Sequence, residues 1–337
     1  MASLPGGVRT RLWRDGLLVA DDFPLDDVSE HLTDDRALVW VDLCDPGHEQ
    51  LSALAAELTL DEHAVEDAIA RGERTKTARY PTHTFLTVYA THLERPSGAV
   101  GGIESRLRTT RVSAFVLPRG VVTVRRGGPF DLDEVVSRWD DHADLIQYGT
   151  GALLHGLLDV IVDGQFDTIQ ALDDAIETIE DGLFGDTAPT RATQHRIYRL
   201  RKELVQLRRV VLPMREVVTA IMRHRADHGN NAELDGWYTD LYDHVIRATE
   251  WTESLRDMVT TVFETNLSLQ DARLNTVMKK LTGWAAIIAV PTAVTGWYGM
   301  NVPYPGFGHG WGVLVSSVVI AGSAGLLYLV FKRRDWL

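Results

Sequence analysis

The chain has 337 residues, of which 34 are Lys or Arg and 47 are Asp or Glu, so its net charge at pH 7 is −13. This negative balance argues against a nucleic-acid-binding protein, whose affinity depends on basic side chains that neutralise phosphates, and it suits metal cations better. The charges are unevenly placed, because residues 281–331 contain no Asp, Glu, Lys or Arg. That stretch could cross a bilayer twice at about 20 residues per crossing, which excludes a purely soluble protein as the default.

The N-terminal residues lack the apolar segment of a secretory signal, so we expect the polar part of the chain to stay in the cytosol. The single cysteine, Cys44, agrees with a reducing compartment. No CxxC pair or His/Cys cluster is available for structural zinc, and no nucleophile–base spacing or phosphate-cradling loop stands out. We therefore predict that the protein is not an enzyme and carries no resident cofactor.

Residues 1–150 have the pattern of a cytosolic domain that mixes helices and strands. Short β-branched or aromatic runs predict strands over 37–43, 84–93, 112–117 and 120–125. Between the first two strands, the sequence predicts two short helices that are separated near Thr59. This part of the chain is therefore predicted to be an α+β domain.

Residues 151–230 predict a charged helical hairpin. Its first arm, 151–190, carries nine acids and no Lys or Arg, whereas 191–225 carry ten bases and two acids. The Gly and Pro of GDTAPT mark the joint, so we expect antiparallel helices held by complementary charge. Pro213 should kink the second helix or begin a new one.

After a second break at 227–231, one helix is predicted from Glu233 to about Asn301, roughly 100 Å long at 1.5 Å per residue. Its first half, 231–280, is charged and would be a cytosolic stalk. Its second half, 281–300, would be the first transmembrane helix, followed by an outer loop at 301–311, a second span at 312–331 and a basic tail at 332–337. Basic residues flank both spans on one side only, so we expect both termini in the cytoplasm and the protein in the cytoplasmic membrane.

A stripe of small or polar residues follows the long helix at steps of three and four. In a membrane, such a stripe indicates either tight helix packing or a wall that faces water. A period near 3.5 that continues across the membrane boundary favours several copies of the helix around an axis. The candidate pore-lining residues are Asn275, Met278, Leu281, Thr282, Ala285, Ala289, Thr292 and Gly296.

At the outer end of this stripe stands Tyr298-Gly299-Met300-Asn301, followed by a final span and a basic Trp-Leu ending. This arrangement resembles the CorA family of magnesium channels, two-span transporters defined by a Gly-Met-Asn signature between their spans. The segment 275–282 is similar to the family's pore-helix entry, and Val41-Asp42-Leu43 and 61–68 are similar to its cytosolic domain. The resemblance covers most of the chain and is strongest over about the last 65 residues.

The resemblance implies a funnel-shaped homopentamer whose long helices form a stalk and pore in the lipid bilayer. Gly299, Met300 and Asn301 would form the selectivity filter, in which side-chain carbonyls bind hydrated Mg²⁺ without stripping its water. Gly299 would let the backbone turn with a positive φ. Met278 and Leu281 would be the hydrophobic constriction, and Asn275 and Thr292 further stations for the hydrated ion.

The resemblance also implies gating by intracellular metal between neighbouring cytosolic domains. Matching motif to motif assigns Glu66 and Asp67 to this regulatory metal, with Glu264 on the stalk as the partner across the interface. The alternative for Glu66 and Asp67 is a solvated helix face. For Asp159, Asp163 and Asp167, which are spaced by four, we expect pairing mainly with the basic helix.

The outer loop departs from the family pattern, because it contains no acid where many members carry Met-Pro-Glu-Leu. Co²⁺ or Ni²⁺ could accompany Mg²⁺, and His309 gives weak support to Zn²⁺ as cargo, as in the ZntB branch. A different class also stays open, namely a non-conducting, membrane-anchored metal sensor. An anchor alone would not need the polar stripe or Asn301.

Overall fold

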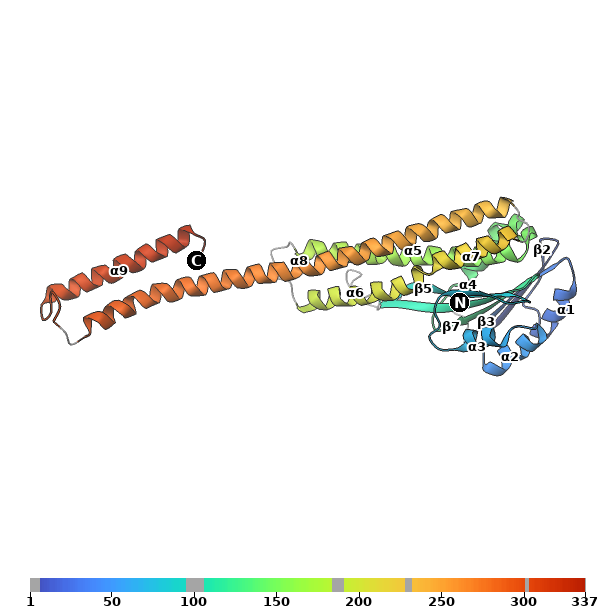
Figure 1. Cartoon of the computed structure of the whole chain (residues 1–337), viewed down its shortest axis with the longest axis horizontal. Coiled ribbons are helices and arrows are strands. Elements are labelled where there is room, and N and C mark those ends of the chain that lie inside the picture. The colour runs from blue at the N-terminus through green and yellow to red at the C-terminus, as the bar shows by residue number, and fades with distance from the viewer. Residues whose placement is uncertain (1–6, 95–105, 184–190, 228–231, 301–302, 337) are drawn as a thin grey trace. The chain divides into compact units, whose positions relative to one another are not determined.

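The structure, a computed structural model, describes the chain except residues 1–6, 95–105, 184–190, 228–231, 301–302 and 337 (Figure 1). Contacts divide the chain into two compact units, Met1–Val262 and Phe263–Leu337. The finer division into seven segments stays a prediction.

A seven-stranded sheet organises the first unit, with the strand order β2-β1-β3-β7-β6-β5-β4. Neighbouring strands are antiparallel except β3 and β7, which run parallel. The strands are β1 Val8–Arg14, β2 Leu17–Asp21, β3 Ala37–Cys44, β4 Lys76–Arg79, β5 Thr84–Glu94, β6 Arg106–Val116 and β7 Gly120–Arg126. Together with the helices, they confirm the predicted α+β class.

Helices follow or interrupt these strands. Those of the first unit are α1 Val28–Thr33, α2 His48–Glu57, α3 Glu62–Ile69, α4 Leu132–Asp141, α5 Thr150–Leu183, α6 Arg191–Val211 and α7 Met214–Asp227, with 3-10 turns at Leu25–Asp27 and Ala143–Tyr148. The helix α8, Ala232–Tyr298, continues from the first unit into the second, which also contains α9, Gly310–Arg333.

The sheet is covered on both faces, so its strands alternate between two cores. In β3, Leu38 and Trp40 belong to a core shared with α4, α5, α7 and the start of α8, whereas Val39, Val41 and Leu43 belong to a core shared with α2 and α3. Figure 1 shows α2 and α3 below the sheet and α5 and α7 above it. Side chains alternate across a strand, and both faces of the sheet are covered, so nearly every residue of β3 is buried. This burial on both faces explains why β3 is almost continuously apolar.

The predicted strands and short helices are confirmed, with different ends. The strand expected over 112–117 begins earlier, at Arg106. The two short helices after β3 are separated around Thr59, as predicted, and Thr59 has a φ of +55°. The strands β1, β2 and β4 were not expected. The helix predicted from Glu233 is confirmed as the single helix α8, and Pro213 separates α6 from α7 as expected.

The expected ion pairing between the hairpin helices is wrong where the structure describes it. Asp159 and Asp163 of α5 both accept hydrogen bonds from Arg138 of α4, at 2.8 Å for Asp163. The described acids of α5 form no ion pair with the described bases of α6, and Arg208 of α6 pairs instead with Glu253 of α8. The reason is orientation, because most bases of α6 lie on its exposed side.

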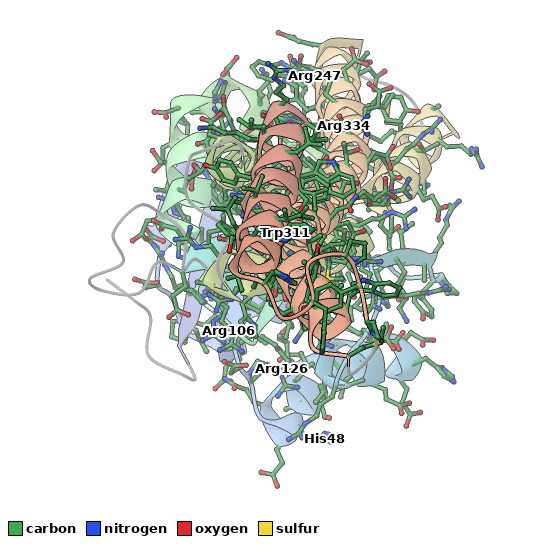
Figure 2. All side chains as sticks on the ribbon, turned by 90° about the vertical axis from the view of Figure 1, so that its left-hand side faces the viewer. His48, Arg106, Arg126, Arg247, Trp311 and Arg334 are labelled. Atoms are coloured by element: carbon green, nitrogen blue, oxygen red, sulfur yellow. The ribbon has the colours of Figure 1, made fainter. Side chains whose placement is uncertain are left out.

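In the second unit, the end of α8 and the whole of α9 are each long and apolar enough to cross a membrane. Only 6% and 0% of their most apolar windows are buried, unlike the core helices of a soluble protein. Trp311 lies in the first turn of α9 and Arg334 directly follows its last turn (Figure 2). An aromatic residue at one end and basic residues at the other are typical of a transmembrane helix.

Candidate functional site

The residues predicted to line a pore share one face of α8 in the second unit. At 100° per residue, the eight positions from Asn275 to Gly296 fall within an arc of about 120°. All eight are exposed, Met278 by 57% and Leu281 by 63%. The structure therefore brings these residues together on one uncovered helix face, and their role as a pore wall stays a prediction.

The opposite face of the same helix is partly covered. Gly283 is buried, and Ile287, Val290 and Val294 are partly buried. Within the second unit, α9 folds back antiparallel to the end of α8 (Figure 1). Small and polar residues thus remain on the side of α8 that its own chain leaves open.

Thr292 presents an oxygen on this open face. Its hydroxyl donates to the backbone carbonyl of Ile288 at 3.1 Å, so the proton is occupied and the oxygen lone pairs remain as acceptors. The water molecules around a hydrated cation point their hydrogens outwards and need such acceptors. Thr295 donates to the carbonyl of Pro291 in the same way, at 2.9 Å, and lies outside the arc of the eight positions.

At the end of α8, Gly299 lies close to the backbone of the preceding turn. Its N–H donates to the carbonyl of Thr295 at 2.9 Å, and a Cβ added at Gly299 would lie 3.1 Å from that oxygen. The expectation of a positive φ at Gly299 is wrong, because the helical turn continues through this residue and requires close approach instead. Met300 is exposed by 43%, and Asn301 lies outside the described residues.

Aromatic rings organise the described part of the loop after α8. Tyr304 packs edge-on against Tyr298 and Phe307, with ring centroids 4.8 and 5.4 Å apart. Gly306 has a φ of +96°, and its carbonyl lies 2.6 Å from where a Cβ on Gly312 would stand. This close approach fixes the loop against the start of α9.

The three candidate regulatory acids have different surroundings. Asp67, near the end of α3, pairs with Lys76 at 2.7 Å, and Lys76 also pairs with Glu73 at 2.8 Å. Burial disfavours the charge of Lys76, but the hydrogen bonds to both acids outweigh it and raise its pKa. The side chain of Glu66 is exposed and has no hydrogen bond or ion pair with the described residues. Glu264 is exposed on α8 in the other unit.

The two cytosolic motifs have structural roles. Asp42, fully buried, accepts from Arg125 at 2.7 Å and from the Thr123 hydroxyl at 2.7 Å. Asp61 caps α3 by accepting from the N–H of His63 at 2.9 Å. Val41-Asp42-Leu43 therefore joins β3 to β7 in the middle of the sheet.

The sequence did not indicate one polar cluster of the first unit. Ligand atoms of Asp159, Asp163 and His244 lie within 4.8 Å of one another, and Arg138 contacts both carboxylates. Burial raises the pKa of Asp159, which Arg138 partly offsets, and burial lowers the pKa of the neighbouring His155. The i, i+4 spacing of the two acids was visible in the sequence, but their partner on α4 was not.

A family model described as "CorA-like Mg2+ transporter protein" matches residues 35–333. The cobalt/magnesium transport protein CorA of Thermotoga maritima is 33% identical over 186 residues, which are 55% of this chain and 52% of that protein. The protein of the same name from Methanocaldococcus jannaschii is 24% identical over 331 residues, covering 96% of this chain and 98% of the relative.

Solved structures agree with this match at the level of fold. The complete structure of the CorA magnesium transporter from Methanocaldococcus jannaschii superposes with a TM-score of 0.77 at 19% identity, covering 100% of both chains. The cytoplasmic domain of ZntB from Vibrio parahaemolyticus gives a TM-score of 0.56 at 12% identity, covering 79% of this chain and 99% of that one. The resemblance inferred from the Gly-Met-Asn signature is thus confirmed, and the chain belongs to the family of CorA-like Mg²⁺ transporter proteins.

Proposed function

We propose that this chain is the subunit of a membrane channel that conducts hydrated Mg²⁺ into the cytoplasm. The observation that carries the proposal is the exposed stripe of small and polar residues on α8, which leads to Gly299-Met300-Asn301. A bilayer would not leave the Thr282 and Thr292 side chains facing lipid without cost, so the face needs a partner. Copies of the same helix around a water-filled axis supply that partner.

The chemistry of the stripe suits a hydrated cation. Mg²⁺ gives up its inner water reluctantly, so neutral oxygens that accept hydrogen bonds from this water bind it with little dehydration. Thr292, with its hydroxyl proton already donated to Ile288, is such an acceptor. Asn301 would offer amide oxygens at the outer mouth. The names of the relatives, cobalt/magnesium transport proteins, support Mg²⁺ with Co²⁺ as a second cargo.

The proposed assembly is a homopentamer in the cytoplasmic membrane with both termini inside. Basic residues precede α8's apolar half and follow α9, which supports this orientation. Entry needs no nucleotide, since a divalent ion gains about 4.6 kcal/mol per 100 mV of inside-negative potential. Native mass spectrometry of the detergent-solubilised protein would test the subunit count.

We further propose that intracellular Mg²⁺ closes the channel by bridging acids of neighbouring subunits. Bringing carboxylates together costs repulsion that a bound divalent ion removes. Glu66 is the better ligand of the α3 pair, because it is exposed and Lys76 already neutralises Asp67. Glu264 would face it from the adjacent stalk.

The regulatory proposal predicts that Glu66→Gln raises the internal Mg²⁺ concentration needed for half inhibition of flux. Asp67→Asn should have a smaller effect, and Glu62→Gln, which removes an exposed charge from the same helix, should have none. Equal effects of all three changes would show that only net charge matters and would remove the assignment.

Transport itself is tested by ion flux into proteoliposomes of the purified protein. We expect Mg²⁺ entry that follows an inside-negative potential and ignores a pH gradient. Zn²⁺ entry driven by protons would assign the chain to ZntB-type transport instead. The absence of flux for Mg²⁺, Co²⁺ and Zn²⁺ would leave a membrane-anchored metal sensor and overturn the channel proposal.

A further inference from the structure

A groove in the first unit, which shares no residue with the stripe or the Gly-Met-Asn segment, is lined by arginines. It lies between α6, the joint at Leu212-Pro213 and the part of α8 that belongs to this unit, and its volume is about 530 Å³. Four guanidinium groups line it, and no acid is among its lining residues. They belong to Arg201, Arg208, Arg209 and Arg256.

Helical spacing explains why three of these arginines meet. Arg201, Val205 and Arg209 are four residues apart, so they lie one above the other on the same side of α6, with Arg208 beside them. Arg201 and Arg209 are eight residues apart, about two helical turns, so their like charges lie on the same side of α6 and repel each other. An acidic chain with a net charge of −13 nevertheless concentrates bases on this face. The repulsion would be relieved by a bound anion.

The four arginines are held differently. Glu253 pairs with both Arg208 and Arg256, the latter at 3.2 Å, and Asp257 pairs with Arg256 at 2.7 Å. These contacts fix two guanidinium groups at one wall of the groove. Arg201 and Arg209 form no ion pair with the residues that the structure describes, so two full positive charges remain available.

The floor of the groove is apolar. Leu204 and Val259 are buried, with 3% and 2% of their surface exposed, whereas Val205 is 44% exposed between Arg201 and Arg209. A ligand that combines a flat apolar body with a charged group would cover this valine while its charge reaches the guanidinium groups. The volume falls in the range of about 300–1,000 Å³ that is common for small-molecule sites.

Guanidinium forks bind phosphate oxygens through pairs of parallel hydrogen bonds, which makes arginine the preferred residue for phosphate recognition. We propose that this groove binds a phosphate-bearing anion of nucleotide size, with Arg201 and Arg209 as the principal phosphate contacts.

The test is calorimetric titration of the purified full-length protein in neutral detergent, at low salt and without metal, with ADP and with pyrophosphate. We expect saturable binding of both, about one per chain, and none of adenosine. Arg201→Gln and Arg209→Gln should each weaken ADP binding about tenfold or more, since each removes a charge-assisted contact. Arg223→Gln, which removes an exposed charge of α7 outside the groove, should leave the affinity unchanged.

Each of the following results would overturn the proposal. ADP and pyrophosphate could fail to bind, or bind with the same affinity when both Arg201 and Arg209 are replaced. Adenosine could bind as tightly as ADP, which would exclude phosphate recognition. Finally, the arginine variants could change only the binding of phosphatidylglycerol vesicles or only the subunit count, which would assign this face to lipid or to a second copy. Unchanged thermal unfolding of each variant shows that these comparisons are made on folded protein.

Discussion

Replacing Arg125 by Leu would expose the cost of an unpaired charge in the middle of the sheet. Asp42 of β3 is fully buried, and its carboxylate accepts from the Nε of Arg125 at 2.9 and 3.0 Å and from its Nη2 at 2.7 Å. Burial disfavours the charge of Arg125, but the carboxylate outweighs it and raises the pKa of Arg125. Without Arg125, the Thr123 hydroxyl would be the one hydrogen-bond donor to this buried carboxylate among the described residues.

Breaking a buried pair by removing one partner costs about 3–5 kcal/mol. In a domain of this size, 1 kcal/mol shifts the midpoint of thermal unfolding by about 2–4 °C, so Arg125→Leu should lower it by about 6–20 °C. Arg119→Leu is the matched control, because the pair of Arg119 with Asp35 is exposed and is worth at most about 1 kcal/mol.

Circular dichroism of the purified full-length protein measures both midpoints. The double variant with Leu at both Asp42 and Arg125 should recover most of the loss, since replacing a buried pair by apolar side chains is often neutral. If Arg125→Leu shifted the midpoint no more than Arg119→Leu, or if the double variant were the least stable of all, the reasoning would be refuted.

Three further predictions concern the second unit and the helices of the first. Thr292→Val should slow Mg²⁺ flux about fivefold or more, since one hydrogen bond is worth about 1 kcal/mol. Thr295→Val, outside the stripe, should leave the flux unchanged. Equal flux in both variants would contradict the claim that the stripe lines the ion path. Gly299→Ala should reduce flux severalfold because its Cβ would meet the Thr295 carbonyl at 3.1 Å, while Gly310→Ala, with nothing within 4 Å, serves as control. Burial lowers the pKa of His155 below 6.5, so at mildly acidic pH the unfolded chain binds a proton that the folded chain does not. The midpoint temperature of thermal unfolding should therefore be lower at pH 5.5 than at pH 7, and the difference should be smaller in His155→Gln. An equal difference in both proteins would refute this role of His155.

The sequence predicts those elements whose pattern reflects burial. β3 and β7 are buried on both faces, and β3 and the first five residues of β7 are mostly apolar. The end of α8 and nearly all of α9 lie in the uncharged stretch. β2 and β4 are short edge strands without a buried residue. β4 has no apolar run, and the apolar run of β2 is exposed, so neither strand shows the pattern of a buried strand. β6 begins earlier than expected because its first residues, from Arg106, pair with the end of β5 up to Glu94, and this pairing does not depend on an apolar pattern.

The candidate site was predictable only where it lies along one helix. The stripe from Asn275 to Gly296 follows from spacing alone, because its members share the face of a single element. Pairing between elements does not follow from composition. The acids of α5 suggested the bases of α6 as partners, yet Asp159 and Asp163 pair with Arg138 of α4. Arg138 is a single base among many acids in its part of the sequence, so composition did not point to it.

The claim that the stripe of α8 faces a water-filled ion path is tested most directly by thiol accessibility. The single native cysteine, Cys44, is replaced by serine, and a cysteine is placed at Thr292 on the exposed face or at Ile287 on the partly buried face. Mg²⁺ flux into proteoliposomes is then followed while a positively charged, membrane-impermeant thiol reagent is added. The account predicts rapid block of the Thr292→Cys variant and little effect on Ile287→Cys. Block of Ile287→Cys alone, or unaltered flux in both variants, would contradict it.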